Sequence, residues 1–155
     1  MGIEDDILFI ERVPTLRALG RDALRILAIG AESRYVHKGE VLFMAGEVAD
    51  SGYVVQEGSF LLEGRSKAVG DIIAGPGTLL GELALIFEIK RPATATANEP
   101  STVIRISRSL FLKMLEGYLH AALVLRDQIV ARAQQALTDM SDVRAMLDTS
   151  QTPPQ

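Results

Sequence analysis

Hydrophobic residues follow two different spacings along the chain, and the changes between them divide it into three parts. Residues 14–29 carry apolar positions at helical spacing, with Pro14 and Thr15 at the beginning. Residues 33–106 instead carry short apolar runs that recur at intervals of about ten residues and end at turn residues. Helical spacing returns after Ser107. This order predicts a mainly β protein with flanking helices.

The central part contains seven short apolar runs that we interpret as strands. Glycine or proline separates most of them, as in the segment 75–77, which reads Gly-Pro-Gly. Strands this short, with turns between them, are typical of a sandwich, a barrel or a jelly roll. The runs lie at residues 35–37, 41–43, 53–55, 60–62, 68–73, 94–97 and 102–106.

Two helices are predicted in the last part of the chain. Ser107 is suited to cap a first helix over about residues 108–117, and Gly117 separates it from a second over about residues 119–147. Spacings of four and three alternate along the second helix, as in the seam of a coiled coil. Two interpretations stay open: this seam packs on the chain's own β part, or it joins two copies in a parallel homodimer. The seam consists of Ile129, Ala133, Ala136, Met140, Val143 and Leu147.

Composition removes several classes of protein. No apolar run reaches 18 residues, so a membrane span is not expected, and the acidic N-terminus does not resemble a secretory signal. The chain has no cysteine, which excludes disulfides and thiolate metal sites. Its net charge of −4 argues against a general nucleic-acid-binding surface. We therefore expect a cytoplasmic protein.

The most specific motif is Gly81-Glu82-Leu83-Ala84-Leu85-Ile86, followed by Arg91-Pro92-Ala93-Thr94-Ala95. Gly81 has no Cβ atom and lets a ligand approach the backbone closely. Residues 83–87 are compatible with one helical turn, whose free N–H groups would attract an anion. Arg91 can hold a phosphate through two N–H groups at once, and Glu82 can accept a hydrogen bond from a sugar hydroxyl. An anion receptor and a sugar receptor in one short segment indicate a nucleotide.

This segment closely resembles the phosphate-binding cassette of cyclic-nucleotide-binding domains. That family includes catabolite activator proteins, protein kinase A regulatory subunits and cyclic-nucleotide-gated channels. The resemblance extends from about Val13 to Leu147 and includes Lys38-Gly39-Glu40-Val41-Leu42 and Gly46-Glu47. It implies a β-roll, or jelly roll, with a long C-terminal helix.

The resemblance also implies roles for single residues. Glu82 would bind the ribose 2′-hydroxyl and Arg91 the cyclic phosphate, while backbone N–H groups near Gly81 and Ala84 would complete the cradle. In the family the long helix can also touch the purine, and no spacing rule selects among three candidates for that contact, Gln134, Gln135 and Thr138. The implied ligand-binding set is Gly81, Glu82, Leu83, Ala84, Arg91, Pro92 and Ala93.

Two positions depart from the family's pattern. Leu80 stands where the family has an aromatic residue, which is a mild change. Pro92 stands where the family usually has Ala, Ser or Thr, and proline has no N–H to donate to a phosphate. A lost hydrogen bond to a charged group costs roughly 1.5–3 kcal/mol, and Lys90 adds a positive charge that would offset part of it. A Thr after the arginine often accompanies cGMP preference in the family, and Pro92 offers no hydroxyl, so that clue is missing here. We expect cAMP, and cGMP stays open.

Three classes of function compete for this chain. The first is a non-catalytic sensor of a cyclic purine nucleotide that signals through its C-terminal helix to an unidentified partner protein. The second is a degenerate, ligand-free β-roll that serves as a dimerisation or interaction scaffold, an alternative that Pro92 supports. The third, a jelly-roll enzyme of the cupin type, is disfavoured because His37 and His120 are isolated. We expect no metal, no cofactor beyond the nucleotide, and no catalytic residue.

The expected organisation is one domain with several segments. About eight residues follow Leu147, too few for a helix-turn-helix, so direct DNA binding is not expected. The segments are an N-terminal helical part (residues 1–32), a β-roll with the cassette (33–107), C-terminal helices (108–148) and a tail (149–155).

Overall fold

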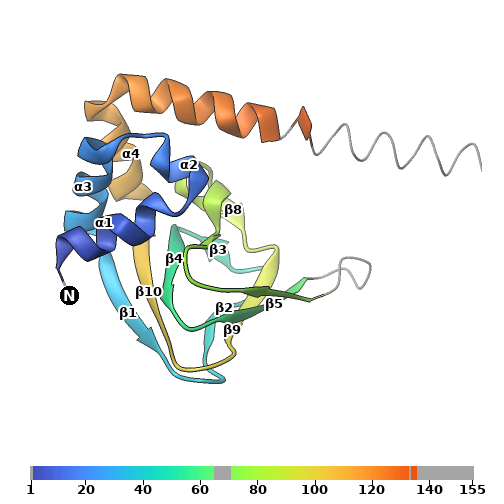
Figure 1. Cartoon of the computed structure of the whole chain (residues 1–155). Helices are drawn as coiled ribbons and strands as arrows, with labels where there is room; N and C mark the ends of the chain where they lie inside the picture. Colours follow the sequence, from blue (N-terminus) through green and yellow to red (C-terminus); the bar gives the residue numbers. More distant parts are fainter. Residues whose placement is uncertain (1, 65–70, 133, 136–155) are drawn as a thin grey trace, which may run out of the picture.

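The computed structural model describes residues 2–64, 71–132, 134 and 135 as a β-roll with helices gathered at one end (Figure 1). The prediction of a mainly β fold with flanking helices is therefore confirmed. The helices are α1 (Ile3–Glu11), α2 (Pro14–Arg17), α3 (Arg21–Gly30), the 3₁₀ helix η1 (Glu82–Leu85), α4 (Arg108–Gly117) and a C-terminal helix over residues 119–132. The strands are β1 (Glu32–Val36), β2 (Val41–Phe43), β3 (Val48–Ala49), β4 (Ser51–Glu57), β5 (Phe60–Gly64), β6 (Ile72–Ala74), β7 (Leu79–Leu80), β8 (Ile89–Lys90), β9 (Ala93–Ala97) and β10 (Ser101–Ser107).

Within the described residues, the strands form two four-stranded sheets and one short ribbon, and all of their pairings are antiparallel. One sheet has the order β1-β10-β4-β7 and the other β2-β9-β5-β6, while β3 pairs with β8. Strands distant in sequence become neighbours, as where Val54 pairs with Ile104. This arrangement brings the segment after β7 and the segment before β9 together, which places the two halves of the cassette motif side by side.

Strands β4 and β10 contribute to two hydrophobic cores because both faces of their sheet are covered. Tyr53, Val55 and Val103 face the second sheet, whereas Val54 and Ile104 pack against the helices. Successive side chains of a strand point to opposite faces, so a strand covered on both sides needs apolar residues at consecutive positions. This is why the run at residues 53–55 does not alternate between apolar and polar residues.

The prediction of one helix over residues 14–29 is wrong. The helix is divided into α2 and α3 at Gly20, whose φ of 94° lies outside the helical region. A further helix, α1, precedes them and buries Ile7 and Ile10 in the helical core. Acidic residues in its first turn interact favourably with the helix dipole.

Most of the predicted strands are confirmed, with small shifts in their ends. The three two-residue strands β3, β7 and β8 were not predicted, because so short a segment has no recognisable alternation. For the predicted run over residues 68–73, the structure has a strand at Ile72–Ala74, and residues 68–70 lie outside the described part.

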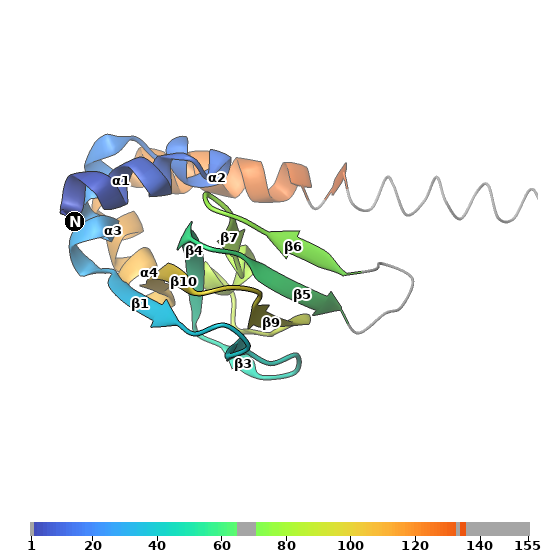
Figure 2. The same ribbon diagram turned by 60° about the horizontal axis from the view of Figure 1, so that its bottom comes forward.

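The C-terminal helix packs against the same core as the other helices. Ala121 and Leu125 are buried, and Ile129 is partly buried against that core, while Leu123 and Val130 are exposed. Figure 2 shows the helix running alongside the N-terminal helices at one end of the β-roll. Of the predicted seam, Ala133, Ala136, Met140, Val143 and Leu147 lie outside the described residues, so the homodimer stays a prediction.

Among the described residues, no helix is both long and apolar enough to cross a bilayer.

The predicted cap of α4 is confirmed and gives a test of the helical end. The Ser107 hydroxyl accepts a hydrogen bond from the backbone N–H of Leu110 at 3.1 Å. Replacing Ser107 by Ala should lower the free energy of unfolding by about 1 kcal/mol, because one helix-start N–H loses its partner. Ser107→Asp is the matched control, since Asp also caps helices and should retain most of the stability. Urea denaturation followed by circular dichroism measures both, and equal losses in the two variants would contradict a capping role.

Candidate functional site

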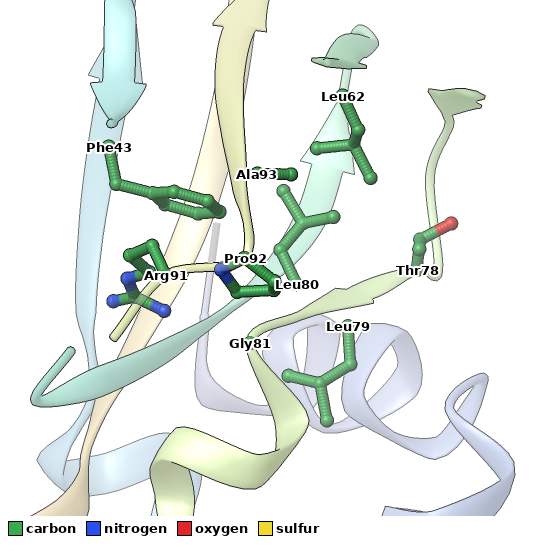
Figure 3. A pocket seen from close by; sticks show the side chains of 9 residues that line it. All are labelled: Phe43, Leu62, Thr78, Leu79, Leu80, Gly81, Arg91, Pro92 and Ala93. Carbon is green, nitrogen blue, oxygen red and sulfur yellow. The ribbon is translucent and has the colours of Figure 1, made fainter. Parts of the chain in front are cut away.

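A pocket lies where the end of β7 meets the start of β9, under the inner face of the β2-β9-β5-β6 sheet (Figure 3). It has a volume of about 180 Å³. Most of its lining is apolar, and a single guanidinium supplies its charge. The lining residues are Phe43, Leu62, Thr78, Leu79, Leu80, Gly81, Arg91, Pro92 and Ala93.

Arg91 is the charged residue of this pocket, and the fold holds it almost completely buried. Only 4% of the residue is exposed. Its guanidinium carbon lies 4.3 Å from the centre of the Phe43 ring and 5.6 Å from that of Tyr53, and these two rings stack on each other. An aromatic face attracts a cation at such distances. Aromatic rings from two strands, β2 and β4, thus lie close to the guanidinium.

The hydrogen-bonding capacity of Arg91 is only partly used. One nitrogen, Nη2, donates to the Ser51 hydroxyl at 3.4 Å. The other, Nη1, is buried and has no hydrogen-bond partner within the described part of the chain. Burial lowers the pKa of Arg91, and the neighbouring Tyr53 and Asp50 only partly offset this. A guanidinium nevertheless keeps its proton in proteins, so the pocket contains a buried cation with a donor nitrogen that no described residue engages.

The main chain at both ends of the motif is fixed as well. The N–H of Arg91 donates to the Glu47 carbonyl, and its own carbonyl accepts from the N–H of Gly46, both at 2.8 Å. Gly81 lies against the guanidinium with a φ of 80°, and a Cβ atom there would overlap with Arg91 Nη1. Only glycine satisfies both requirements at position 81 without strain.

Glu82 begins η1 directly after Gly81, but its carboxylate is held by helices. Its Oε1 accepts a hydrogen bond from the Thr15 hydroxyl of α2 at 2.7 Å. Its Oε2 forms an ion pair with Arg132 of the C-terminal helix. A quarter of the Glu82 side chain is exposed. The carboxylate therefore connects the cassette to α2 and to the C-terminal helix.

The far end of η1 is anchored by Arg108, the first residue of α4. Its Nη1 donates to the carbonyls of Ala49 at 3.0 Å, Ala84 at 3.4 Å and Phe87 at 2.9 Å. Carbonyls at the end of a helix carry partial negative charge and lack partners within the helix. Arg108 thus ties η1 to α4 and to β3.

The structure brings together part of the predicted ligand-binding set. Gly81, Arg91, Pro92 and Ala93 line the pocket, whereas Glu82, Leu83 and Ala84 belong to the adjoining η1. Leu83 is 49% exposed and Ala84 is buried. Of the candidates for the purine contact, the exposed residues Gln134 and Gln135 belong to the C-terminal helical segment, and Thr138 lies outside the described residues.

Several residues of the site were not predicted from the sequence. Phe43 and Tyr53 belong to predicted strands, where aromatic residues are ordinary core residues, and only the fold shows that both rings contact Arg91. Thr15 and Arg132 lie far from the motif in sequence, and no spacing rule links either of them to Glu82.

The arrangement is suited to binding an anion with a single charge that carries an apolar or sugar portion. The buried guanidinium offers a donor, the apolar walls exclude water from it, and low local polarity strengthens a charged hydrogen bond. Glu82, which directly follows the lining residue Gly81, carries a partly exposed carboxylate with capacity for a further hydrogen bond.

The sequence and fold of the chain are similar to those of known proteins. The family model described as cyclic nucleotide-binding domain matches residues 33–118. A solved structure of a cyclic nucleotide-binding-like protein from Brucella abortus is similar, with 37% identity and a TM-score of 0.63; the match covers 72% of this chain and 98% of that one.

Two relatives belong to different classes of protein, an ion channel and a regulatory subunit of a protein kinase. A potassium channel of Arabidopsis thaliana, named GORK, is 28% identical over 129 residues, or 79% of this chain. A cAMP-dependent protein kinase regulatory subunit of Yarrowia lipolytica is 30% identical over 102 residues, or 66% of this chain. The matches span only 15% and 27% of those proteins. Since the family model matches more than half of the residues, this chain belongs to the cyclic nucleotide-binding domain family.

Proposed function

We propose that the pocket binds a 3′,5′-cyclic purine nucleotide, cAMP in preference to cGMP, and that the chain is a non-catalytic sensor module. The observation that carries this proposal is the buried guanidinium of Arg91, whose Nη1 has no partner among the described residues. A buried donor on a charged group costs free energy when it lacks an acceptor. A bound phosphate would remove that cost.

A cyclic phosphodiester fits the pocket better than a more highly charged phosphate. It carries one negative charge, which matches the one guanidinium that lines the pocket. The apolar side chains of Leu62, Leu79 and Leu80 suit the sugar and base better than free phosphate oxygens. The relative from Yarrowia lipolytica is named for cAMP dependence, which supports a purine cyclic nucleotide.

We further propose that nucleotide binding is transmitted through the C-terminal helix to a partner protein. Glu82 is the link, because it joins the cassette to Arg132 of that helix. A ligand that binds one arrangement of this contact more tightly than another would shift the population between them. The alternative, a ligand-free scaffold, is favoured by Pro92, which has no N–H to offer a phosphate.

A variant without the Arg91 charge distinguishes a nucleotide sensor from a ligand-free scaffold. In Arg91→Met we expect cAMP affinity to fall by about 100-fold or more, since two charged hydrogen bonds are lost. The free energy of unfolding should stay within about 1 kcal/mol of the parent or rise, because the variant removes a buried charge whose Nη1 has no acceptor among the described residues. Calorimetry and urea denaturation measure the two effects.

The matched control for that variant is Arg105→Met. Arg105 is more exposed and pairs with Asp50 at the surface, so its loss should leave affinity nearly unchanged. A parent chain that shows no heat and no thermal shift with millimolar cAMP or cGMP would favour the scaffold instead.

Pro92 allows a second test of the same pocket. Pro92→Ala restores a backbone N–H at the start of β9, and we expect cAMP to bind about 10- to 100-fold more tightly if that N–H donates to the phosphate. The gain would be smaller if proline already holds the loop in its bound form. Calorimetric titration decides the matter, and weaker binding by the Ala variant would show that the loop depends on proline.

A charged residue introduced into the predicted seam of the C-terminal helix tests the homodimer. Ala136→Glu should convert a parallel dimer to monomer, because two carboxylates would meet at a closely packed position. Ala131→Glu is the control, since Ala131 lies on the exposed helix surface and off the seam. Sedimentation velocity at tens of micromolar distinguishes them, and a monomeric parent would refute the homodimer.

A further inference from the structure

Thr15 is a polar residue in the middle of an apolar core. It lies in α2 between Val13 and Leu16, both of which are buried in the helical core. Only 1% of Thr15 is exposed, so it has no access to solvent or to the pocket. A buried hydroxyl costs free energy unless it makes a hydrogen bond. The Thr15 hydroxyl makes one, to Oε1 of Glu82 at 2.7 Å.

This hydrogen bond holds Oε1 of Glu82 toward the buried Thr15 and away from solvent. Thr15 is a short side chain on a packed helix, so the position of its oxygen is set by the fold. Arg132, which contacts the other oxygen, is long and 51% exposed, and an exposed ion pair contributes little to holding one geometry. Of the two donors, Thr15 is therefore the one that determines the orientation of the carboxylate.

A carboxylate oxygen has lone pairs to spare after one hydrogen bond. Each of the two oxygens of Glu82 has one donor in the structure, and a carboxylate accepts about four hydrogen bonds in total. A ligand hydroxyl can thus be added without displacing Thr15, provided that the carboxylate plane is already turned correctly.

We propose that Thr15 is a positioning residue for sugar recognition: it orients Glu82 so that the carboxylate accepts a hydrogen bond from the ribose 2′-hydroxyl of the nucleotide. This inference rests on the proposed function. It assigns to the N-terminal helices a part in ligand selectivity, although Thr15 itself never touches the ligand. α2 and the C-terminal helix both lie at the helical end of the molecule in Figure 1.

The test compares cAMP with 2′-deoxy-cAMP, which differs only in the hydroxyl that Glu82 would bind. We expect the parent to prefer cAMP by about tenfold or more, the range for a hydrogen bond to a charged group. Thr15→Val keeps the shape of the side chain and removes the hydroxyl. It should weaken cAMP binding by about tenfold, leave 2′-deoxy-cAMP binding nearly unchanged, and bring the affinity ratio close to one.

Thr15→Ser is the conservative control, because it keeps the hydroxyl and should keep the ratio of the parent. Thr15→Ala removes the hydroxyl with less bulk and replaces the Val variant if that one fails to fold, as judged by circular dichroism. A structural role alone would weaken both nucleotides equally and leave the ratio unchanged, which would overturn the inference. A parent that binds both nucleotides equally would also overturn it while leaving the proposed function intact. A parent that binds neither would refute the proposed function, and the inference would fall with it.

Discussion

Burial of the Arg91 guanidinium constrains the residues that surround it. A charge removed from water needs compensation from its surroundings, and here it comes from the faces of Phe43 and Tyr53 and from the Ser51 hydroxyl. These partners lie on two strands from different sheets, β2 and β4. Gly81 completes the enclosure, since any side chain there would collide with the guanidinium. The β-roll thus encloses a cation whose Nη1 has no hydrogen-bond acceptor among the described residues.

The 3₁₀ helix η1 of the cassette is held at both of its ends by residues from outside the β-roll. At its start, Glu82 contacts Thr15 of α2 and Arg132 of the C-terminal helix. At its end, Arg108 of α4 holds the carbonyls of Ala84 and Phe87. A displacement of η1 must therefore alter contacts with several helices together. Coupling of this kind needs only packed elements with two arrangements of similar free energy.

The sequence was sufficient for the fold class, for most strands and for the cap of α4, because each depends on a local pattern or on one residue type. It failed where the deciding feature was too short or not local. Gly20 interrupts an apolar periodicity that otherwise reads as one helix, and β3, β7 and β8 have two residues each.

The candidate site divides in the same way. The motif at Gly81 and Arg91 is readable because its chemistry lies within a short segment, whereas the contact between Thr15 and Glu82 joins residues 67 positions apart. Such a contact follows from the position of α2 relative to η1 in the folded chain, which no periodicity encodes. The same holds for the two rings around Arg91, whose residues read from the sequence only as strand residues.

Nη1 of Arg91, which has no partner in the part of the chain that the structure describes, also bears on the choice between a sensor and a scaffold. In a scaffold, an apolar residue at position 91 would fill the same space and avoid the cost of burying a charge, as replacements of buried ion pairs by apolar side chains have shown in general. Phe43, Leu62 and Leu80 would provide a suitable environment for it. A guanidinium in this place makes physical sense when an anion completes its hydrogen bonds. Because Pro92 has no N–H to donate, a bound anion would be held less tightly than with another residue at this position. The kind of ligand is unaffected, because the charge of the pocket still comes from Arg91.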